Sequence, residues 1–208
     1  MKKVFLLLMI AGLGACATPS LRTGAANWRD YKRVNFFAAG HKQVAFKVSG
    51  SMNQLNMDGV LVVKKIGEED YDVSVLTDGA YRVLQATVSP EGIAYKYLFQ
   101  DADTAIVRGL INQFLNVLLS DLGTYKTQRL QKEALVITYS GKKVKTRLYY
   151  HPDIPYPFAA KTIASLNTAD LSYDNYMPAD ENGTVQLPHT LIYKDGDIAL
   201  DMELISLH

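Results

Sequence analysis

The sequence predicts an α+β fold built on one long, curved antiparallel sheet. Apolar and polar residues alternate in short runs over 43–99 and again over 125–204, as they do in half-buried strands. Short turns separate the runs, which is typical of an antiparallel meander. The segment 103–121 between these regions has helical periodicity instead. About ten or eleven strands, one central helix and one short N-terminal helix are therefore expected.

The first fifteen residues predict a signal peptide. Lys2 and Lys3 precede an apolar run at 4–13, which is shorter than the roughly 20 residues that a membrane-spanning helix needs. Residues 13–16 read Leu-Gly-Ala-Cys and resemble a bacterial lipobox, in which the cysteine thiol is acylated and becomes the new N-terminus. The alternative is an ordinary secretory signal followed by a chance cysteine. Cys16 is the one cysteine of the chain and stands where the motif requires it, which favours lipid attachment, palmitate included.

Three parts are expected after this assignment. Residues 1–15 form the signal peptide, 16–27 a lipidated tether of small and polar residues, and 28–208 a single β-rich periplasmic domain. One cysteine allows no intramolecular disulfide, so the core must hold the domain. Ala17 is not Asp, which by the sorting rule of enterobacterial lipoproteins implies a periplasm-facing place on the outer membrane. Membrane attachment through the N-terminal lipid is thus the first expected partner interaction.

The charge balance argues against a nucleic-acid partner. The formal charge of +1 becomes −1 once Lys2 and Lys3 are removed, which leaves no electrostatic footprint for nucleic acid. Polar residues interrupt the longest later apolar stretch, 105–122, so a transmembrane helix is not expected there.

The first half of the domain is expected to begin with a short helix over 28–37 that packs Trp28, Tyr31 and Val34 on one side. The alternating residues then predict strands at 43–48, 60–63, 71–75 and 93–99. Both faces of the strand at 60–63 are apolar and are expected to be covered. Asp-Gly at 78–79 predicts a two-residue type I′ turn, and Pro-Glu-Gly at 90–92 predicts the next turn. Strict alternation places Tyr95 and Tyr97 on one face of the strand at 93–99.

The helix at 103–121 is the clearest element. Asp103 and Thr104 are good N-cap residues, and Gly123 is a suitable stop. The apolar positions follow i, i+3, i+4 spacing: Ile106, Val107, Leu110, Ile111, Phe114, Leu115, Leu118 and Leu119. So wide a stripe must be buried, and the concave face of a curved sheet is the natural place.

Strands resume after this helix. They are expected at 125–130, 135–139, 144–150, 159–166, 169–173, 186–193 and 198–204, with turns at 140–141 and 194–197. The proline-rich segment 151–157 predicts a loop or an edge, and 174–183 predicts a loop.

This order of elements resembles the lipoprotein-localisation factors, specifically the outer-membrane lipoprotein receptor and its periplasmic carrier relative. The resemblance covers most of 43–206, and the matching features are Trp28, 48–50, 59–62, 71–75, 81–84, Gly183, 187–188, Ile192 and Asp195. It implies an unclosed β-barrel whose helix acts as a lid or plug over an apolar cavity for acyl chains. The receptor also engages the membrane through an exposed apolar residue on a protruding loop, for which this chain offers Leu55, Tyr156 or Phe158.

The resemblance implies a ligand site in the concavity beneath the helix at 103–121. Its expected residues are Ile111, Phe114, Leu115 and Leu118 on the helix and Tyr95 and Tyr97 on the sheet. The alternative for all six is ordinary core or sheet packing. Two functions follow: an outer-membrane-anchored lipoprotein that binds acyl chains or lipoproteins in a half-barrel cavity for transfer, or an envelope lipoprotein without a cavity that docks on another protein through 149–158.

Enzymatic signals are weak. The sequence has no Gly-x-Ser-x-Gly elbow, no His-Glu-x-x-His helix and no phosphate-binding glycine loop. The four histidines are scattered, so no catalytic residue, metal or cofactor is expected, and an envelope hydrolase is the least favoured interpretation. Asp195, Asp197 and Asp201 hint at calcium, but the EF-hand spacing is missing, and a hairpin turn is preferred.

Overall fold

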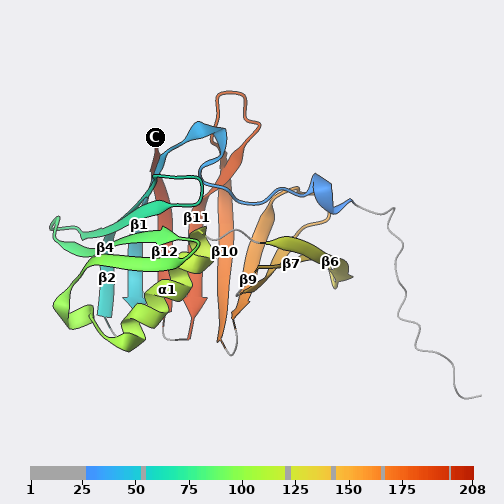
Figure 1. The fold of residues 1–208 in the computed structure, drawn as a ribbon. Helices are drawn as coiled ribbons and strands as arrows, with labels where there is room; N and C mark the ends of the chain where they lie inside the picture. Colours follow the sequence, from blue (N-terminus) through green and yellow to red (C-terminus); the bar gives the residue numbers. More distant parts are fainter. Residues whose placement is uncertain (1–26, 53–54, 120–122, 142–143, 165–166, 197) are drawn as a thin grey trace, which may run out of the picture.

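Twelve antiparallel strands form the sheet that carries the fold (Figure 1). The structure is a computed structural model that describes residues 27–52, 55–119, 123–141, 144–164, 167–196 and 198–208. The strand order is β5-β4-β3-β2-β1-β12-β11-β10-β9-β8-β7-β6. The predicted signal peptide at 1–15, Cys16 and the predicted tether up to residue 26 lie outside the described residues.

Every strand pairs with its neighbours in antiparallel fashion, as the short turns predict. The strands are β1 (Gln43–Met52), β2 (Leu55–Lys65), β3 (Tyr71–Thr77), β4 (Arg82–Ser89), β5 (Gly92–Leu98), β6 (Thr124–Gln131), β7 (Ala134–Ser140), β8 (Lys145–Tyr150), β9 (Pro157–Ala164), β10 (Asn167–Pro178), β11 (Gln186–Asp195) and β12 (Ile198–Leu207). The helical elements are α1 (Ala105–Leu119) and the 3₁₀ turns η1 (Trp28–Asp30), η2 (Ala38–Gly40) and η3 (Gln100–Ala102). The strand count is twelve, one or two more than the sequence predicts.

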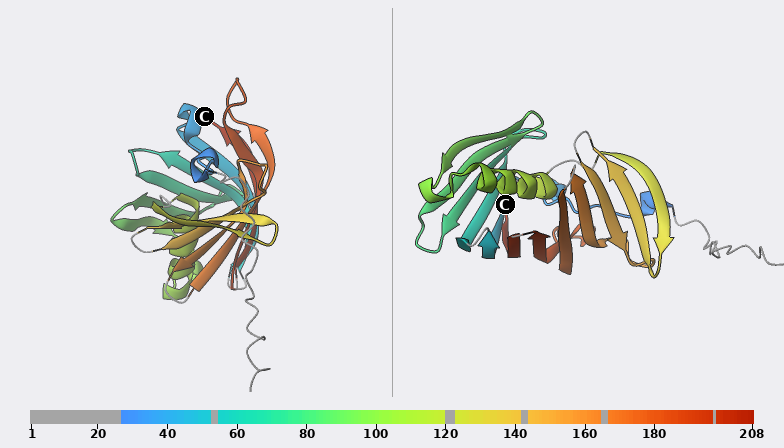
Figure 2. Two further views of the ribbon diagram at one scale, coloured as in Figure 1. Left: turned by 90° about the vertical axis from the view of Figure 1, so that its right-hand side faces the viewer. Right: turned by 90° about the horizontal axis from the view of Figure 1, so that it is seen from below.

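The sheet does not close into a barrel. Strands β5 and β6 are its two edges, and α1 is the element that joins them in sequence. The chain must therefore cross the open side of the curved sheet as a helix. Figure 2 shows this arrangement from below, with the strands in an arc and α1 lying across its opening. The α+β prediction of an unclosed barrel with a central lid or plug helix is confirmed.

The concave face of the sheet holds the core. Register places the buried side chains of neighbouring strands opposite one another, as with Phe46 and Leu61 and with Leu171 and Tyr193. Further buried members of this face are Val48, Val63, Val73, Ile137, Leu148, Leu191 and Leu200. The apolar stripe of α1 packs on this surface, because burial of apolar area is the main favourable term in folding.

Helix α1 forms as its sequence predicts. The hydroxyl of Thr104 accepts a hydrogen bond from the backbone N–H of Val107 at 3.2 Å, so the predicted N-cap residue caps the helix. Gly123 follows the helix with φ of +77°, and a Cβ there would lie 2.4 Å from the carbonyl oxygen of Ser140. Only glycine fits that turn between helix and sheet. Among the described residues, no helix combines the length and the hydropathy needed to cross a bilayer.

The short helix predicted over 28–37 is wrong. Only η1 is helical there, because the following backbone groups bond to a distant loop and strand instead of to one another. The N–H of Lys32 donates to the carbonyl of Pro155 at 2.7 Å, and the hydroxyl of Tyr150 donates to the carbonyl of Lys32 at 3.1 Å. Trp28, Tyr31 and Val34 nevertheless pack against the core, as the sequence predicts.

Two loop predictions also need correction. The hairpin after β3 is present, but the N–H of Ala80 donates to the carbonyl of Thr77, and the positive φ of 60° falls on Ala80. The connection is therefore a longer turn than type I′. Strand β10 extends to Pro178 because it keeps pairing with β11, so the first half of the loop predicted at 174–183 is strand.

Candidate functional site

Four side chains of α1 fill the concave face of the sheet. Val107, Ile111, Phe114 and Leu115 are buried, and Leu115 is 0% exposed. The ring of Phe114 meets the ring of Tyr193 on β11 edge to face, with 5.1 Å between centroids. Such a pair adds to the apolar burial that holds the helix.

The structure therefore brings the predicted helix residues together. Ile111, Phe114 and Leu115 point into the core, and Leu118 is half-buried against it. Their position between helix and sheet is the one expected for the inner face of a lid, and it is equally the position of a core residue.

Tyr95 on β5 fastens the lid to one edge of the sheet. Its hydroxyl lies 2.7 Å from Oδ1 of Asn112 and 3.2 Å from the carbonyl oxygen of Arg108, both on α1. The guanidinium of Arg108 stands 4.9 Å from the centre of the Tyr95 ring and also binds the carboxylate of Asp103. Burial raises the pKa of the Tyr95 hydroxyl, so this group stays a hydrogen-bond donor at neutral pH.

Tyr97 does not line the site. Its partner in the register is Gln85, whereas Tyr95 pairs with Ala86, and the register shifts between these two pairs. The resulting β-bulge inserts Lys96 and turns Tyr97 to the convex face, where it is 44% exposed. Leu98 takes the place on the concave side. The predicted sharing of one face by Tyr95 and Tyr97 is wrong because the bulge breaks the period of two.

Little open space accompanies these packed side chains. An apolar hollow of about 70 Å³ lies at the end of β1–β4, lined in part by Val48, Met57, Val75 and Val83. Pockets for small molecules usually hold roughly 300–1,000 Å³. An acyl chain bound beneath α1 would have to displace the buried side chains of the helix from the sheet.

A second cover lies over the other half of the sheet. We call residues 28–42 the strap, since this segment runs along the rim from β6 to β1 (Figure 1). Trp28 stacks on Tyr125 with 4.5 Å between centroids, and Tyr31 meets Tyr150 at 5.0 Å. The guanidinium of Arg33 lies 4.2 Å above the ring of Tyr139, a cation–π contact. The strap was not predicted from the sequence. Its mixture of aromatic and basic residues could have indicated stacking and cation–π contacts with tyrosines elsewhere in the chain.

The strap covers part of the segment 149–158, which is predicted from the sequence to dock on another protein. Tyr156 is buried, and its hydroxyl contacts Nζ of Lys32 at 3.2 Å and the N–H of Gln186 at 3.1 Å. Phe158 is half-buried and stacks on His151 at 4.5 Å. Tyr156 is therefore unsuited to the role of an exposed membrane-engaging residue, and the side chain of Leu55 lies outside the described residues.

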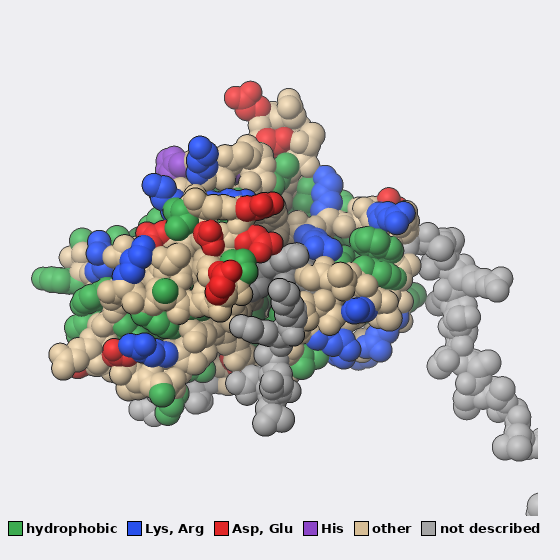
Figure 3. Space-filling model, in the orientation of Figure 1, with side chains coloured by type: hydrophobic (Ala, Val, Ile, Leu, Met, Phe, Trp, Pro, Cys, Tyr) green, Lys and Arg blue, Asp and Glu red, His purple; other side chains and the backbone are tan. Residues whose placement is uncertain are grey.

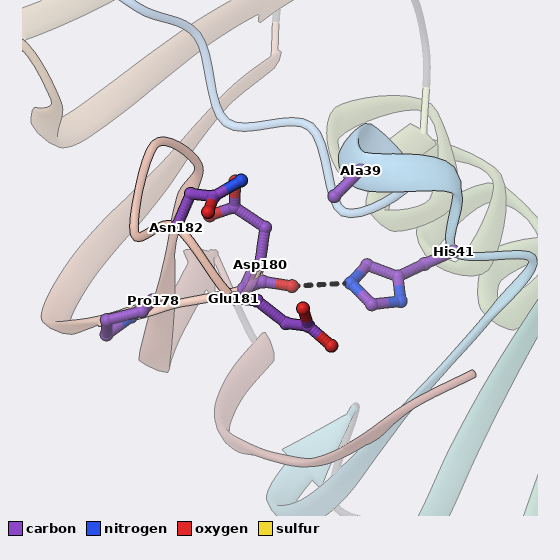
Figure 4. Close-up of a pocket in the computed structure, with 7 residues that line it drawn as sticks. Ala39, His41, Pro178, Asp180, Glu181 and Asn182 are labelled. Atoms are coloured by element: carbon purple, nitrogen blue, oxygen red, sulfur yellow. Dashed lines mark hydrogen bonds between the residues drawn. The ribbon is translucent and has the colours of Figure 1, made fainter.

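A wider polar hollow lies between the strap and the connection from β10 to β11 (Figure 4). It holds about 560 Å³, and Nε2 of His41 lies 2.8 Å from the carbonyl oxygen of Ala179 at its wall. Asp180 accepts hydrogen bonds from the hydroxyl of Thr184 and the N–H of Val185, and these bonds lower the pKa of its carboxyl. Asp180 thus orders its own loop.

The structure gives no support for a calcium site at the last hairpin. Asp195 accepts a hydrogen bond from the hydroxyl of Tyr193 at 3.3 Å, and burial raises the pKa of its carboxyl. Within the described ranges, no group of three His, Cys, Asp or Glu side chains could hold a metal ion. Asp197 lies outside the described residues.

Comparison with known proteins finds relatives in structure alone. No protein-family model and no curated protein sequence matches the chain. A LolA superfamily protein from Nitrosomonas europaea superposes with a TM-score of 0.53 and 13% identity, over 80% of this chain and 84% of that one. A domain from Vibrio parahaemolyticus named for outer membrane lipoprotein sorting gives a TM-score of 0.46 and 9% identity over the same shares. The first superposition shows that this chain has the fold of the LolA superfamily, an unclosed antiparallel barrel with a helix across its open side.

Proposed function

We propose that the mature protein is an outer-membrane lipoprotein, anchored through acylated Cys16, that binds acyl chains of a lipid or lipoprotein between α1 and the concave face of the sheet. One observation carries the proposal. An apolar helix joins the two edges of an unclosed sheet and buries its apolar stripe on the concave face. The name of the first structural neighbour, a LolA superfamily protein, supports the same function.

The energetics allow an acyl chain to replace α1. Each buried side chain of α1 contributes about 1.5–3 kcal/mol, so its four buried residues contribute on the order of 10 kcal/mol. An acyl chain gains about 0.8 kcal/mol for each buried CH₂ group, and a chain of about sixteen carbons reaches a similar total. The exchange is therefore near balance, which suits a carrier that must both accept and release its cargo.

Opening the lid breaks the contact between Tyr95 and Asn112. We expect Tyr95→Phe to raise the apparent affinity for a fluorescent fatty acyl probe about two- to tenfold, because loss of a hydrogen bond worth about 0.5–1.5 kcal/mol makes the open state more populated. Titration of the mature chain with Cys16→Ala measures this effect, and native mass spectrometry identifies any lipid that copurifies. Tyr97→Phe is the matched control, since Tyr97 lies on the opposite face of the same strand. If the parent protein, Tyr95→Phe and Tyr97→Phe all fail to take up the probe, the acyl site is refuted.

The anchor needs its own test. We expect radiolabelled palmitate to enter the wild-type protein in cells, and Cys16→Ala to abolish labelling and release the protein from the outer-membrane fraction. Several acyl chains anchor a protein stably, whereas one holds it reversibly. For the release assay, the variant carries a cleavable secretory signal in place of 1–15. A wild-type protein that is unlabelled and soluble after export would contradict lipid attachment.

A second function is supported by the filled concave face. If α1 never leaves the sheet, the hollow of about 70 Å³ offers no room for an acyl chain, and the protein would be an envelope interaction module. The two functions differ in whether α1 opens independently of the sheet.

A further inference from the structure

Charge is strongly segregated along this chain. Residues 123–164, which contain β6–β9, carry eight Lys and Arg against two Asp and Glu. Residues 167–208, which contain β10–β12, carry one Lys against eight Asp and Glu. The near-neutral total therefore conceals a basic end and an acidic middle of one continuous sheet. Figure 3 shows Lys and Arg side chains at the right-hand end of the molecule and further ones toward its left, with Asp and Glu near its centre and top.

Register gathers several basic residues on the convex face of β6–β9. Arg147 pairs with Thr138 and with Lys161, and Arg129 pairs with Val136 beside Thr138. Lys145 stands two residues before Arg147 and shares its face. We call Arg129, Lys145, Arg147 and Lys161 the basic wing. Lys161 forms an ion pair with Asp170 at 3.4 Å, which marks the border with the acidic strands.

The chain enters the domain at the same end of the sheet as this wing, on the concave face. Trp28 stacks on Tyr125 of β6, and the exposed Arg29 and Lys32 lie on the same stretch. Cys16 precedes Asn27 by eleven residues, which at full extension cover at most about 40 Å. An anchor at Cys16 thus holds the β6 end of the molecule within about 40 Å of the membrane.

We propose that the basic wing docks on the anionic phospholipid headgroups of the membrane that holds the anchor. The orientation rests on the proposed attachment at Cys16, but the charge complementarity does not. Basic residues next to a membrane are attracted by anionic lipids over about one Debye length, roughly 8 Å. The acidic strands β10–β12 are repelled by the same lipids, so the charge pattern itself selects which end faces the surface.

Vesicle co-sedimentation of the mature chain with Cys16→Ala tests the proposal without the anchor. The described domain, with its complete core, is contained in that chain. We expect binding to vesicles of equal parts phosphatidylcholine and phosphatidylglycerol at low ionic strength, and none to phosphatidylcholine alone. Each basic residue in contact is worth about fivefold in binding. The triple variant Arg129→Gln, Lys145→Gln, Arg147→Gln should therefore bind at least about tenfold more weakly.

The matched control removes three charges from elsewhere on the convex face. Lys47, Lys64 and Lys194 are exposed there, and their replacement by Gln should leave vesicle binding within about twofold of the parent. Equal losses of vesicle binding in the two triple variants would show that binding depends on net charge alone, which would overturn the proposed role of the basic wing. Absence of binding by the parent protein to the anionic vesicles would show that lipid headgroups are not the partner of the wing, as would binding of the wing to an acidic protein instead.

These outcomes are separable from those of the acyl site. The wing faces away from α1, so uptake of the fatty acyl probe should be unchanged in both triple variants. Normal uptake with no vesicle binding would refute the wing alone, and normal vesicle binding with no uptake would refute the acyl site alone.

Discussion

Leu115→Ala should lower the free energy that holds α1 on the sheet by about 3 kcal/mol. Leu115 is fully buried on the inner face of the helix, and large-to-small changes at such positions cost about 2–5 kcal/mol through lost transfer energy and the cavity left behind. Ile106→Ala is the control on the same helix. Ile106 is 66% exposed, so its replacement should cost less than about 0.5 kcal/mol.

Hydrogen exchange measured amide by amide decides what this loss means. If α1 is a lid, its amides exchange through a local opening below the global free energy of unfolding. The α1 amides would then report a smaller free energy of opening than the amides of β1 and β12, both in the wild type and in Leu115→Ala, where α1 exchanges about a hundredfold faster. If α1 is permanent core, the amides of helix and sheet share one cooperative unfolding and report one common free energy in both proteins. That second pattern would contradict the acyl-binding function and favour the interaction module.

The lid was predictable from sequence because its signals are local. The spacing of Ile111, Phe114, Leu115 and Leu118 shows the helical period, and the N-cap Thr104 stands beside it. The strand pattern likewise predicts the sheet, since alternation needs only neighbouring residues. The location of α1 across the open side follows from the fact that it joins the two edge strands. The sequence does not reveal that the strands before and after the helix are the edges of the sheet.

The errors come from interactions that are not local. One extra residue, Lys96, shifts the register of β5 and moves Tyr97 to the convex face, and alternation cannot anticipate a bulge. The strap resembles a short helix because Trp28, Tyr31 and Val34 have helical spacing. Its true partners, such as Tyr125 and Tyr150, lie about a hundred residues later in the chain. Tertiary contacts then override the weak local preference.

The same non-local contacts make Tyr150 the point where the strap is most vulnerable. Tyr150 is 0% exposed, its hydroxyl donates to the carbonyl of Lys32, and its ring packs against Tyr31. Tyr150→Phe should cost about 1 kcal/mol for the hydrogen bond, and Tyr150→Ala about 3–5 kcal/mol. Urea unfolding measures both losses. Tyr149→Ala is the control, because Tyr149 lies on the convex face of the same strand and should cost clearly less.

Limited digestion with trypsin locates the damage in Tyr150→Ala. Cleavage after Lys32 and Arg33 should precede cleavage elsewhere, because these residues are held by contacts to Tyr156 and Tyr139 that depend on a seated strap. First cleavage on β1–β3 instead would show that Tyr150 supports the core as a whole and that the strap has no separate stability.

Alkaline pH offers an independent measure of the same contact. Burial raises the pKa of Tyr150 well above its usual range, so the folded state holds this proton more tightly than the unfolded state. The resulting stability is fully present below the ordinary tyrosine pKa of about 10 and is lost as the pH rises above it. Tyr150→Phe removes this contribution, so its deficit relative to wild type should shrink as the pH increases from 9 toward 11. A deficit that stays constant over that range would mean that Tyr150 is not buried under the strap, and the anchor would then be connected to the sheet through a segment free to detach.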